Sequence, residues 1–329
     1  MRVRAVRSAV PETVWDAEAV AALTGADPAF IRGKVGAARR HILAEGETGT
    51  DLSARACRLL VECDGLRLAD VELLVCVTQT PDYRIPHNSA LLQQALGIPT
   101  ACAAFDLSLG CSGYVYGLTV CKGFMEAQGL RTALLVTCDP YSRIMLAADR
   151  ATTAVFGDGA AATWLSADAG AVIGHGDFGT DGSGGDALRV EAGGAVHPHL
   201  SVHDASPRSY GAERLRLHMA GRAVFTFVLE QVPGSIRRCL ERNGLAPSEI
   251  DVFALHQGSL YMLQALAKRC GIPADRLPVN IGRFGNTVSS SVPMLLAELA
   301  DQGRLAPGTR VLVSGFGVGL SWGTNVLTC

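Results

Sequence analysis

The sequence lacks the patterns that would assign it to several large classes of protein. It has no basic run, and 29 Lys and Arg against 31 Asp and Glu leave a net charge of −2, so nothing supplies the cationic footprint that nucleic acid requires. No apolar run approaches the roughly 18 residues of a membrane span. Pro11 interrupts the first apolar stretch before the core of a signal peptide forms. We therefore expect a cytoplasmic protein that binds neither nucleic acid nor a membrane.

A recognisable metal site or disulfide framework is also missing. The ten cysteines include no CxxC pair, so most of them are expected to fill the core. The eight histidines are dispersed, apart from His197, His199 and His203. No cysteine accompanies these three, and we expect a solvated loop there and no bound metal.

The sequence does contain a long alternation of apolar strands and helices. Its 329 residues, 48% of them hydrophobic, are enough for about two domain-sized units. Short apolar runs predict strands at residues 71–78, 132–138, 250–256 and 309–316. Continuous apolar strands separated by helices are typical of an α/β fold with buried sheets.

An internal repeat divides the chain into two similar parts. "DVELLVCVTQ" resembles "EIDVFALHQG", "LLQQALGIP" resembles "ALAKRCGIP", and "VFGDG" resembles "GFGVG". In each pair the second copy lies about half a chain length after the first, and the order is the same. Chance similarity between α/β segments explains one such match better than three. We therefore predict two copies of one α/β unit, residues 1–170 and residues 171–329.

The repeat aligns three residues that are capable of chemistry. Cys111 lies in the first unit, within "FDLSLGCSGYVYG", between an apolar run and a segment with helical spacing. The offset of the repeat carries Cys111 onto Asn286, in a matching glycine turn of the second unit, and His256 ends the predicted strand 250–256. Each is expected just past a strand, at the carboxyl edge where open α/β sheets bind ligands. The apolar residues that recur after the cysteine are Tyr114, Leu118, Cys121 and Met125.

These residue types form a coherent set. A thiol at a helix amino terminus, beside an imidazole, is expected to favour the thiolate, and a thiolate can accept an acyl group. Taken singly, each has an ordinary structural explanation: a buried cysteine, a hydrogen-bonded histidine, a turn asparagine. Their matched placement favours a shared active site of Cys111, His256 and Asn286.

Five motifs resemble those of the β-ketoacyl-ACP synthase III enzymes of the thiolase superfamily. "GCSGYVYGL" is similar to the family's nucleophile segment, "HQGS" to its HQAN motif, "GNTVSSSVP" to its GNTSAASVP motif and "GFGVGLSWG" to its terminal glycine loop. "FGDGAAA" is a fifth match, and the resemblance runs nearly end to end. It implies the thiolase fold, with two duplicated halves in five αβαβα layers, a homodimer, and a catalytic triad of Cys111, His256 and Asn286.

The resemblance also implies a reaction of the acyltransferase class. Cys111 would take an acyl group from acyl-CoA, with the backbone N–H groups of Cys111 and Val318 holding the oxyanion; the family usually has glycine at the position of Val318. His256 and Asn286 would stabilise the enolate formed when malonyl-CoA or malonyl acyl carrier protein loses carbon dioxide. The carbanion would then attack the acyl-cysteine. The CoA thioesters are substrates, and no permanently bound cofactor is expected.

The same resemblance suggests contacts for CoA and for a second subunit. Phe30 replaces a tryptophan associated with stacking on the adenine, Lys34 could serve a phosphate, and Arg150 matches an arginine near the nucleotide. The loop "TPDYRIP", with Tyr83 and Ile85, would lie at the dimer interface and close the acyl pocket of the neighbouring subunit.

Departures from the family pattern concern the acyl carrier protein. Thr226 and Tyr261 occupy two places where carrier-docking basic residues are usual, while Lys268 and Arg269 keep their charge. Docking on an acidic carrier is largely electrostatic, so this loss suggests a weaker, different or absent carrier. Ser259 replaces the usual asparagine after HQ. We therefore expect specialised-metabolite or polyketide-starter biosynthesis as readily as fatty-acid synthesis.

Three other functions compete with this interpretation. A papain-like hydrolase also has Cys, His and Asn in that order, but its CGSCW signature is absent. A non-catalytic partner subunit with this fold typically loses the cysteine, which this chain keeps. A thiolase-fold acyltransferase that forms an ester or amide also needs a cysteine and a histidine, and it stays the main alternative.

Overall fold

The computed structural model describes residues 1–200 and 206–329, so His203 lies outside the described residues. The strands up to residue 170 are β1 (Arg2–Ala9), β2 (Val14–Asp16), β3 (Arg39–His41), β4 (Leu73–Val77), β5 (Ala103–Leu107), β6 (Thr132–Cys138) and β7 (Ala160–Ser166). The helices of this part are α1 (Ala17–Thr24), α2 (Pro28–Phe30), α3 (Gly49–Asp64), α4 (Asn88–Leu96), α5 (Gly113–Gln128) and α6 (Arg150–Thr153).

The remainder of the chain supplies a second set of elements. Its strands are β8 (Ala171–Ile173), β9 (Asp177–Thr180), β10 (Leu188–Val190), β11 (Leu217–Met219), β12 (Val252–Leu255), β13 (Arg310–Gly317) and β14 (Ser321–Thr328). Its helices are α7 (Ala212–Leu215), α8 (Gly221–Arg242), α9 (Leu260–Cys270), α10 (Ile281–Phe284) and α11 (Ser291–Asp301). The four strands predicted from apolar runs are β4, β6, β12 and β13, each with ends within two residues of the prediction.

Strand pairing shows that one unit has been duplicated. Hydrogen-bonded neighbours follow the order β12-β13-β14-β8-β1-β7-β6-β4-β5. β4 is parallel to β6, and β6 and β1 are both antiparallel to β7. In the same way β12 is parallel to β13, and β13 and β8 are both antiparallel to β14. The first two pairs of repeated segments therefore fall on equivalent elements, β4 with β12 and α4 with α9, and the predicted duplicated halves are confirmed. Their division at residue 170 stays a prediction.

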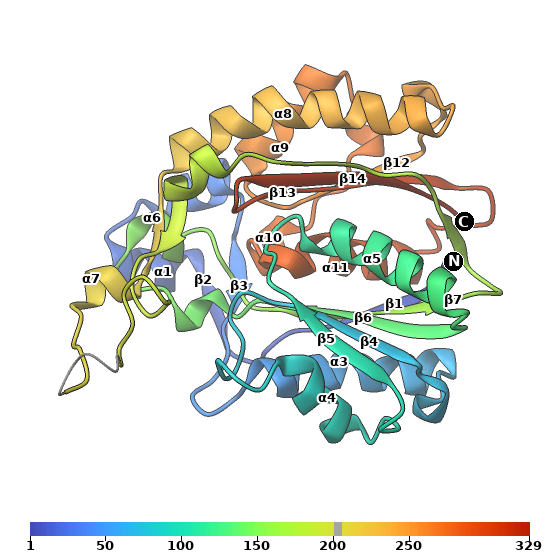
Figure 1. Ribbon diagram of the computed structural model, residues 1–329. Coiled ribbons are helices and arrows are strands. Elements are labelled where there is room, and N and C mark those ends of the chain that lie inside the picture. Colours follow the sequence, from blue (N-terminus) through green and yellow to red (C-terminus); the bar gives the residue numbers. More distant parts are fainter. Residues whose placement is uncertain (201–205) are drawn as a thin grey trace.

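The elements stack in five layers (Figure 1). Helices α8 and α9 cover β12, β13 and β14, while α3 and α4 cover the sheet of β1 and β4–β7; α5 and α11 lie between the two sheets. Helix α5 is suited to this central layer because Tyr114, Leu118, Cys121 and Met125, which recur at helical spacing, are fully buried. The αβαβα thiolase fold predicted from the resemblance is confirmed. In the described ranges, no helix is long and apolar enough to cross a membrane.

Candidate active site

Cys111 lies in a tight turn between β5 and the amino terminus of α5. The turn is closed by a hydrogen bond from the N–H of Gly113 to the carbonyl of Gly110, 2.8 Å long. The end of β13 packs directly on the cysteine: a Cβ added to Gly317 would lie 2.8 Å from the Cys111 sulfur, which is too close for a carbon–sulfur contact. Glycine at position 317 is therefore required for this close approach. The cysteine is 4% exposed, on the wall of a cavity.

The electrostatics of Cys111 differ from the sequence-based expectation. Burial raises the pKa of the thiol to about 12, and hydrogen bonding to the backbone N–H groups of Val318 and of Cys111 itself lowers it only in part. The expectation that the helix terminus and a neighbouring imidazole favour the thiolate is therefore wrong for the free protein. Desolvation of the thiolate outweighs its stabilisation by these two N–H groups. The two N–H groups predicted to hold an oxyanion do lie against the sulfur.

His256 follows β12 and presents a neutral imidazole to the same cavity. Burial lowers the pKa of its ring to about 3, so it carries no charge near neutral pH. Its Nδ1 lies 2.6 Å from Oγ of Ser291. The ring of Phe316 stands at 90° to the imidazole, with the ring centroids 5.5 Å apart. Burial therefore keeps the ring uncharged, and these two contacts fix its position.

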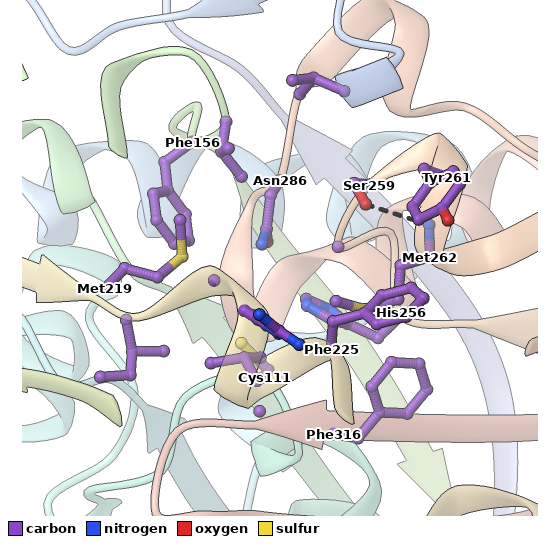
Figure 2. Close-up of a pocket in the computed structure, with 18 of the residues that line it drawn as sticks. Cys111, Phe156, Met219, Phe225, His256, Ser259, Tyr261, Met262, Asn286 and Phe316 are labelled. Carbon is purple, nitrogen blue, oxygen red and sulfur yellow. Dashed lines mark hydrogen bonds between the residues drawn. The ribbon is translucent and has the colours of Figure 1, made fainter. Parts of the chain in front are cut away.

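Asn286 is fixed in both backbone and side chain. It follows the short helix α10 and a glycine, so the expectation that it directly follows a strand is wrong. Its side-chain Oδ1 accepts a hydrogen bond from the N–H of Val288, 2.9 Å long. Val288 makes this bond in a left-handed backbone conformation, with φ 54°. Because Oδ1 is engaged, the amide nitrogen is the group left to point into the cavity (Figure 2).

The three residues line one cavity of about 700 Å³. Figure 2 shows Asn286 and His256 on different walls, both directed toward the space beside the Cys111 sulfur. The structure thus brings together the three residues that the sequence predicted. The rest of the lining is mostly apolar and includes Val35, Val155, Phe156, Leu188, Met219, Val224, Phe225, Met262 and Phe316.

Two of the three residues predicted to contact CoA line this cavity, and the third, Arg150, packs on one of them. Phe30 and Lys34 line it. The guanidinium of Arg150 lies over the ring of Phe30, 5.6 Å from its centroid. The role of these three residues in binding CoA stays a prediction.

Tyr261, which replaces a usual basic residue, forms part of the same wall. Its ring stacks on Phe225, with centroids 5.3 Å apart, and the Lys34 ammonium lies 5.0 Å from the tyrosine ring. Ser259 caps helix α9 by accepting a hydrogen bond from the N–H of Met262, 3.2 Å long. Ser259 and Tyr261 therefore both contact neighbouring residues at the cavity.

The two residues predicted for the loop at the subunit interface do not reach this cavity. Tyr83 and Ile85, in the loop between β4 and α4, are 61% and 86% exposed in the single chain and are not among the lining residues. His197 and His199 pack around the ring of Tyr210. Among residues 1–200 and 206–329, no cluster of three His, Cys, Asp or Glu could hold a metal ion.

Sequence reasoning missed several residues of the site. Ser291 and Phe316 lie inside the motifs "GNTVSSSVP" and "GFGVG", so their proximity to the triad could have been inferred from those motifs. Leu188 and Met219 belong to the two-stranded antiparallel sheet of β10 and β11. Their segments carry no motif, and only the tertiary structure places them at the cavity.

Comparison with known proteins identifies close relatives. The model of the 3-oxoacyl-(acyl-carrier-protein) synthase III family matches residues 105–182, and the model of that family's C-terminal region matches residues 240–329. A β-ketoacyl-(acyl-carrier-protein) synthase III of Clostridioides difficile is 33% identical over 98% of this chain and 96% of its own length.

Solved structures agree with these matches. A crystal structure of a 3-oxoacyl-(acyl-carrier-protein) synthase III superposes with a TM-score of 0.92 at 37% identity, covering 100% of this chain and 99% of the other. The priming β-ketosynthase of the R1128 polyketide pathway superposes with a TM-score of 0.89 at 28% identity, covering 99% and 95%.

Proposed function

The chain belongs to the β-ketoacyl-ACP synthase III family of the thiolase superfamily, and we propose that it condenses an acyl group from acyl-CoA with a malonyl thioester. The observation that carries this proposal is the convergence of Cys111, His256 and Asn286 on one apolar cavity. A nucleophile and a separate pair of uncharged hydrogen-bond donors are what a two-step, decarboxylative acyl transfer needs.

In the first step Cys111 accepts the acyl group. The bond between its sulfur and the acyl carbon forms as the bond to the CoA sulfur breaks, and the cysteine proton leaves with the CoA thiol. The backbone N–H groups of Val318 and Cys111 stabilise the charge that develops on the thioester oxygen. The proposal therefore assigns the oxyanion hole to these two groups.

In the second step His256 and Asn286 act on the malonyl thioester. Loss of carbon dioxide leaves an electron pair that spreads onto the thioester oxygen as an enolate. Two neutral donors aimed at this oxygen stabilise the charge in a desolvated site. The enolate carbon attacks the acyl-cysteine, the new carbon–carbon bond forms, and Cys111 is released and takes up a proton.

The substrates extend from the triad toward Phe30, Lys34 and Arg150, which would hold the nucleotide end of CoA. The chain needs no permanently bound cofactor in this scheme. Malonyl-CoA or a malonyl acyl carrier protein supplies the extender, and the weakened basic surface at Thr226 and Tyr261 favours a different carrier from that of fatty-acid synthesis. The likeness to a priming ketosynthase supports a role in polyketide-starter or other specialised biosynthesis.

We also propose that two copies form a homodimer through β5 and the loop of Tyr83 and Ile85. β5 ends the strand order, so one of its edges has no hydrogen-bonded neighbour in the described chain, and unprotected edges invite pairing with another copy. Ile85 is 86% exposed, which is costly for a large apolar side chain unless a partner covers it.

Mass spectrometry of the intact protein tests the function. After incubation with a panel of acyl-CoAs, we expect one acyl group per chain, mapped by peptide analysis to Cys111. Cys111→Ala should abolish the adduct, and Cys121→Ala, which changes another buried cysteine close by in α5, should keep it. An adduct on a different cysteine, with Cys111 bare, would refute the assignment.

A further inference from the structure

Ser291 lies in the same motif as Asn286, and its side chain contacts His256, which belongs to the other motif. It is the first residue of α11 and is 2% exposed. Its Oγ lies 2.6 Å from Nδ1 of His256 and 3.5 Å from the backbone nitrogen of Gln257. The hydroxyl therefore stands between the imidazole and a backbone N–H group.

The hydrogens available on Ser291, His256 and Gln257 determine which group donates in each of these two hydrogen bonds. The N–H of Gln257 can only donate, so it uses an acceptor site on Ser291 Oγ. If His256 Nδ1 also carried a proton, Oγ would accept twice and its own hydrogen would need another acceptor. No such acceptor for Ser291 is found in the described part of the chain. All groups are satisfied when the hydroxyl donates to an unprotonated Nδ1.

The tautomer matters because the ring is neutral and has one proton to place. With Nδ1 accepting from Ser291, the proton sits on Nε2, which makes no hydrogen bond within residues 1–200 and 206–329. Nε2–H is then available to a ligand in the cavity that His256 lines. The opposite tautomer would present a lone pair, which repels a developing enolate oxygen.

We infer that Ser291 is a positioning residue that fixes His256 as the Nε2–H tautomer and so makes it a hydrogen-bond donor to the substrate. The catalytic consequence rests on the proposed function, but the tautomer itself does not. Ser291 touches neither substrate nor the reacting atoms in this account and acts only through the imidazole.

The surroundings hold this arrangement in place. The Gln257 side chain donates to the carbonyl of Leu255, 2.8 Å away, and accepts from the N–H of Asn280, 3.1 Å away. These bonds fix the segment that carries both His256 and the Gln257 N–H group. Phe316 stacks edge-on against the imidazole and limits rotation of the ring.

Nuclear magnetic resonance on protein labelled with ¹⁵N-histidine tests the inference directly. In wild type, the histidine signal assigned to His256 should show an Nδ1 with the shift of an unprotonated nitrogen and an Nε2 that carries the proton. This histidine is identified by its loss in His256→Gln. A protonated Nδ1 in wild type would overturn the inference, whether or not the enzyme condenses anything.

Variants then test the consequence. Ser291→Ala should shift His256 toward a mixture of tautomers and lower release of carbon dioxide from malonyl thioester by roughly 10-fold, the effect of one hydrogen bond, while Cys111 acylation stays unchanged. Ser291→Thr keeps the hydroxyl and should retain the wild-type tautomer. The matched control is Ser290→Ala, because Ser290 is equally buried but bonds to Thr137.

The two possible failures give different results. If Ser291→Ala leaves both the tautomer and carbon dioxide release as in wild type, the inference is wrong and the proposed function stands. If wild type shows the Nε2–H tautomer but releases no carbon dioxide, the proposed function fails and the tautomer assignment stands. Should Ser291→Ala not fold, the wild-type spectrum and Ser291→Thr still decide.

Discussion

Asn286 is held by Gly157 through a backbone hydrogen bond in which the glycine N–H donates to the asparagine carbonyl over 3.0 Å. The N–H of Asn286 in turn donates to the carbonyl of Val155 over 2.9 Å, and Phe156 and Asn286 form a parallel bridge. The first half of the chain therefore positions a residue of the active site that belongs to the second half. The site depends on both copies of the repeat.

Gly157→Ala should disrupt this contact. A Cβ at residue 157 would lie 2.2 Å from the backbone carbonyl oxygen of Phe284, so the segment leading to Asn286 must move. Displacements of about 1 Å near reacting groups cost roughly 100-fold in rate. We expect carbon dioxide release from malonyl thioester to fall by that order while Cys111 is still acylated. Gly123→Ala is the control, since nothing lies within 4 Å of its new Cβ; equal rates in both variants would contradict this role.

The reactivity of Cys111 should rise steadily with pH. Its pKa of about 12 means that only the minor thiolate form reacts near neutrality, and this form increases about tenfold per pH unit below the pKa. We therefore expect the rate of alkylation by iodoacetamide at Cys111 to climb without levelling between pH 6.5 and pH 9. Peptide mass spectrometry at each pH measures it. A plateau reached below pH 8 would show that the thiolate is stabilised in the free protein.

Tyr141 should limit the size of the acyl group. It is buried in the cluster that contains Cys111, its ring centroid lies 5.1 Å from that of Phe156, and its hydroxyl donates to Gln79 Oε1 over 3.0 Å. Tyr141→Leu removes volume beside the nucleophile. It should raise the rate with hexanoyl-CoA relative to acetyl-CoA by at least about 10-fold, the scale of one or two methylenes in an apolar pocket.

The control for this change is Tyr141→Phe, which removes the hydrogen bond to Gln79 and keeps the ring. Acylation rates with a series of acyl-CoAs should then keep the wild-type preference. A shift in Tyr141→Phe as large as in Tyr141→Leu would assign the selectivity to the hydroxyl and not to the volume of the ring.

Ile85→Asp should weaken the proposed homodimer. A charge placed in an apolar contact between subunits must be desolvated without a partner, whereas the same charge on a solvent-facing loop costs little. Sedimentation velocity should show dimers for wild type and a shift toward monomers for this variant. Val196→Asp changes an equally exposed apolar residue, 83% exposed, and should stay dimeric. A monomeric wild type at micromolar concentration would rule out the dimer.

The sequence predicted those features of the fold and the site that depend on local pattern and on the internal repeat. The apolar runs predicted β4, β6, β12 and β13, and the repeat offset placed Asn286 opposite Cys111. The local structure at Asn286 was not predicted. Asn286 follows a short helix, and its own backbone N–H and carbonyl bond to Val155 and Gly157. Such long-range pairing leaves no local pattern in the sequence. The high pKa of Cys111 also escaped prediction, since helix dipoles can be inferred from sequence while desolvation depends on tertiary packing.

Release of carbon dioxide from a malonyl thioester by the acylated protein tests the central claim most directly. Wild type carrying an acyl group on Cys111 should release carbon dioxide from malonyl-CoA or malonyl acyl carrier protein. Asn286→Ala should lower this by roughly 100-fold, the effect of losing one oxyanion donor. Asn286→Asp, which keeps an acceptor for the Val288 N–H but no donor, should be as slow. If acylated wild type released no carbon dioxide from either thioester, yet passed its acyl group to an alcohol or an amine, the protein would be an ester- or amide-forming transferase and this account would be wrong.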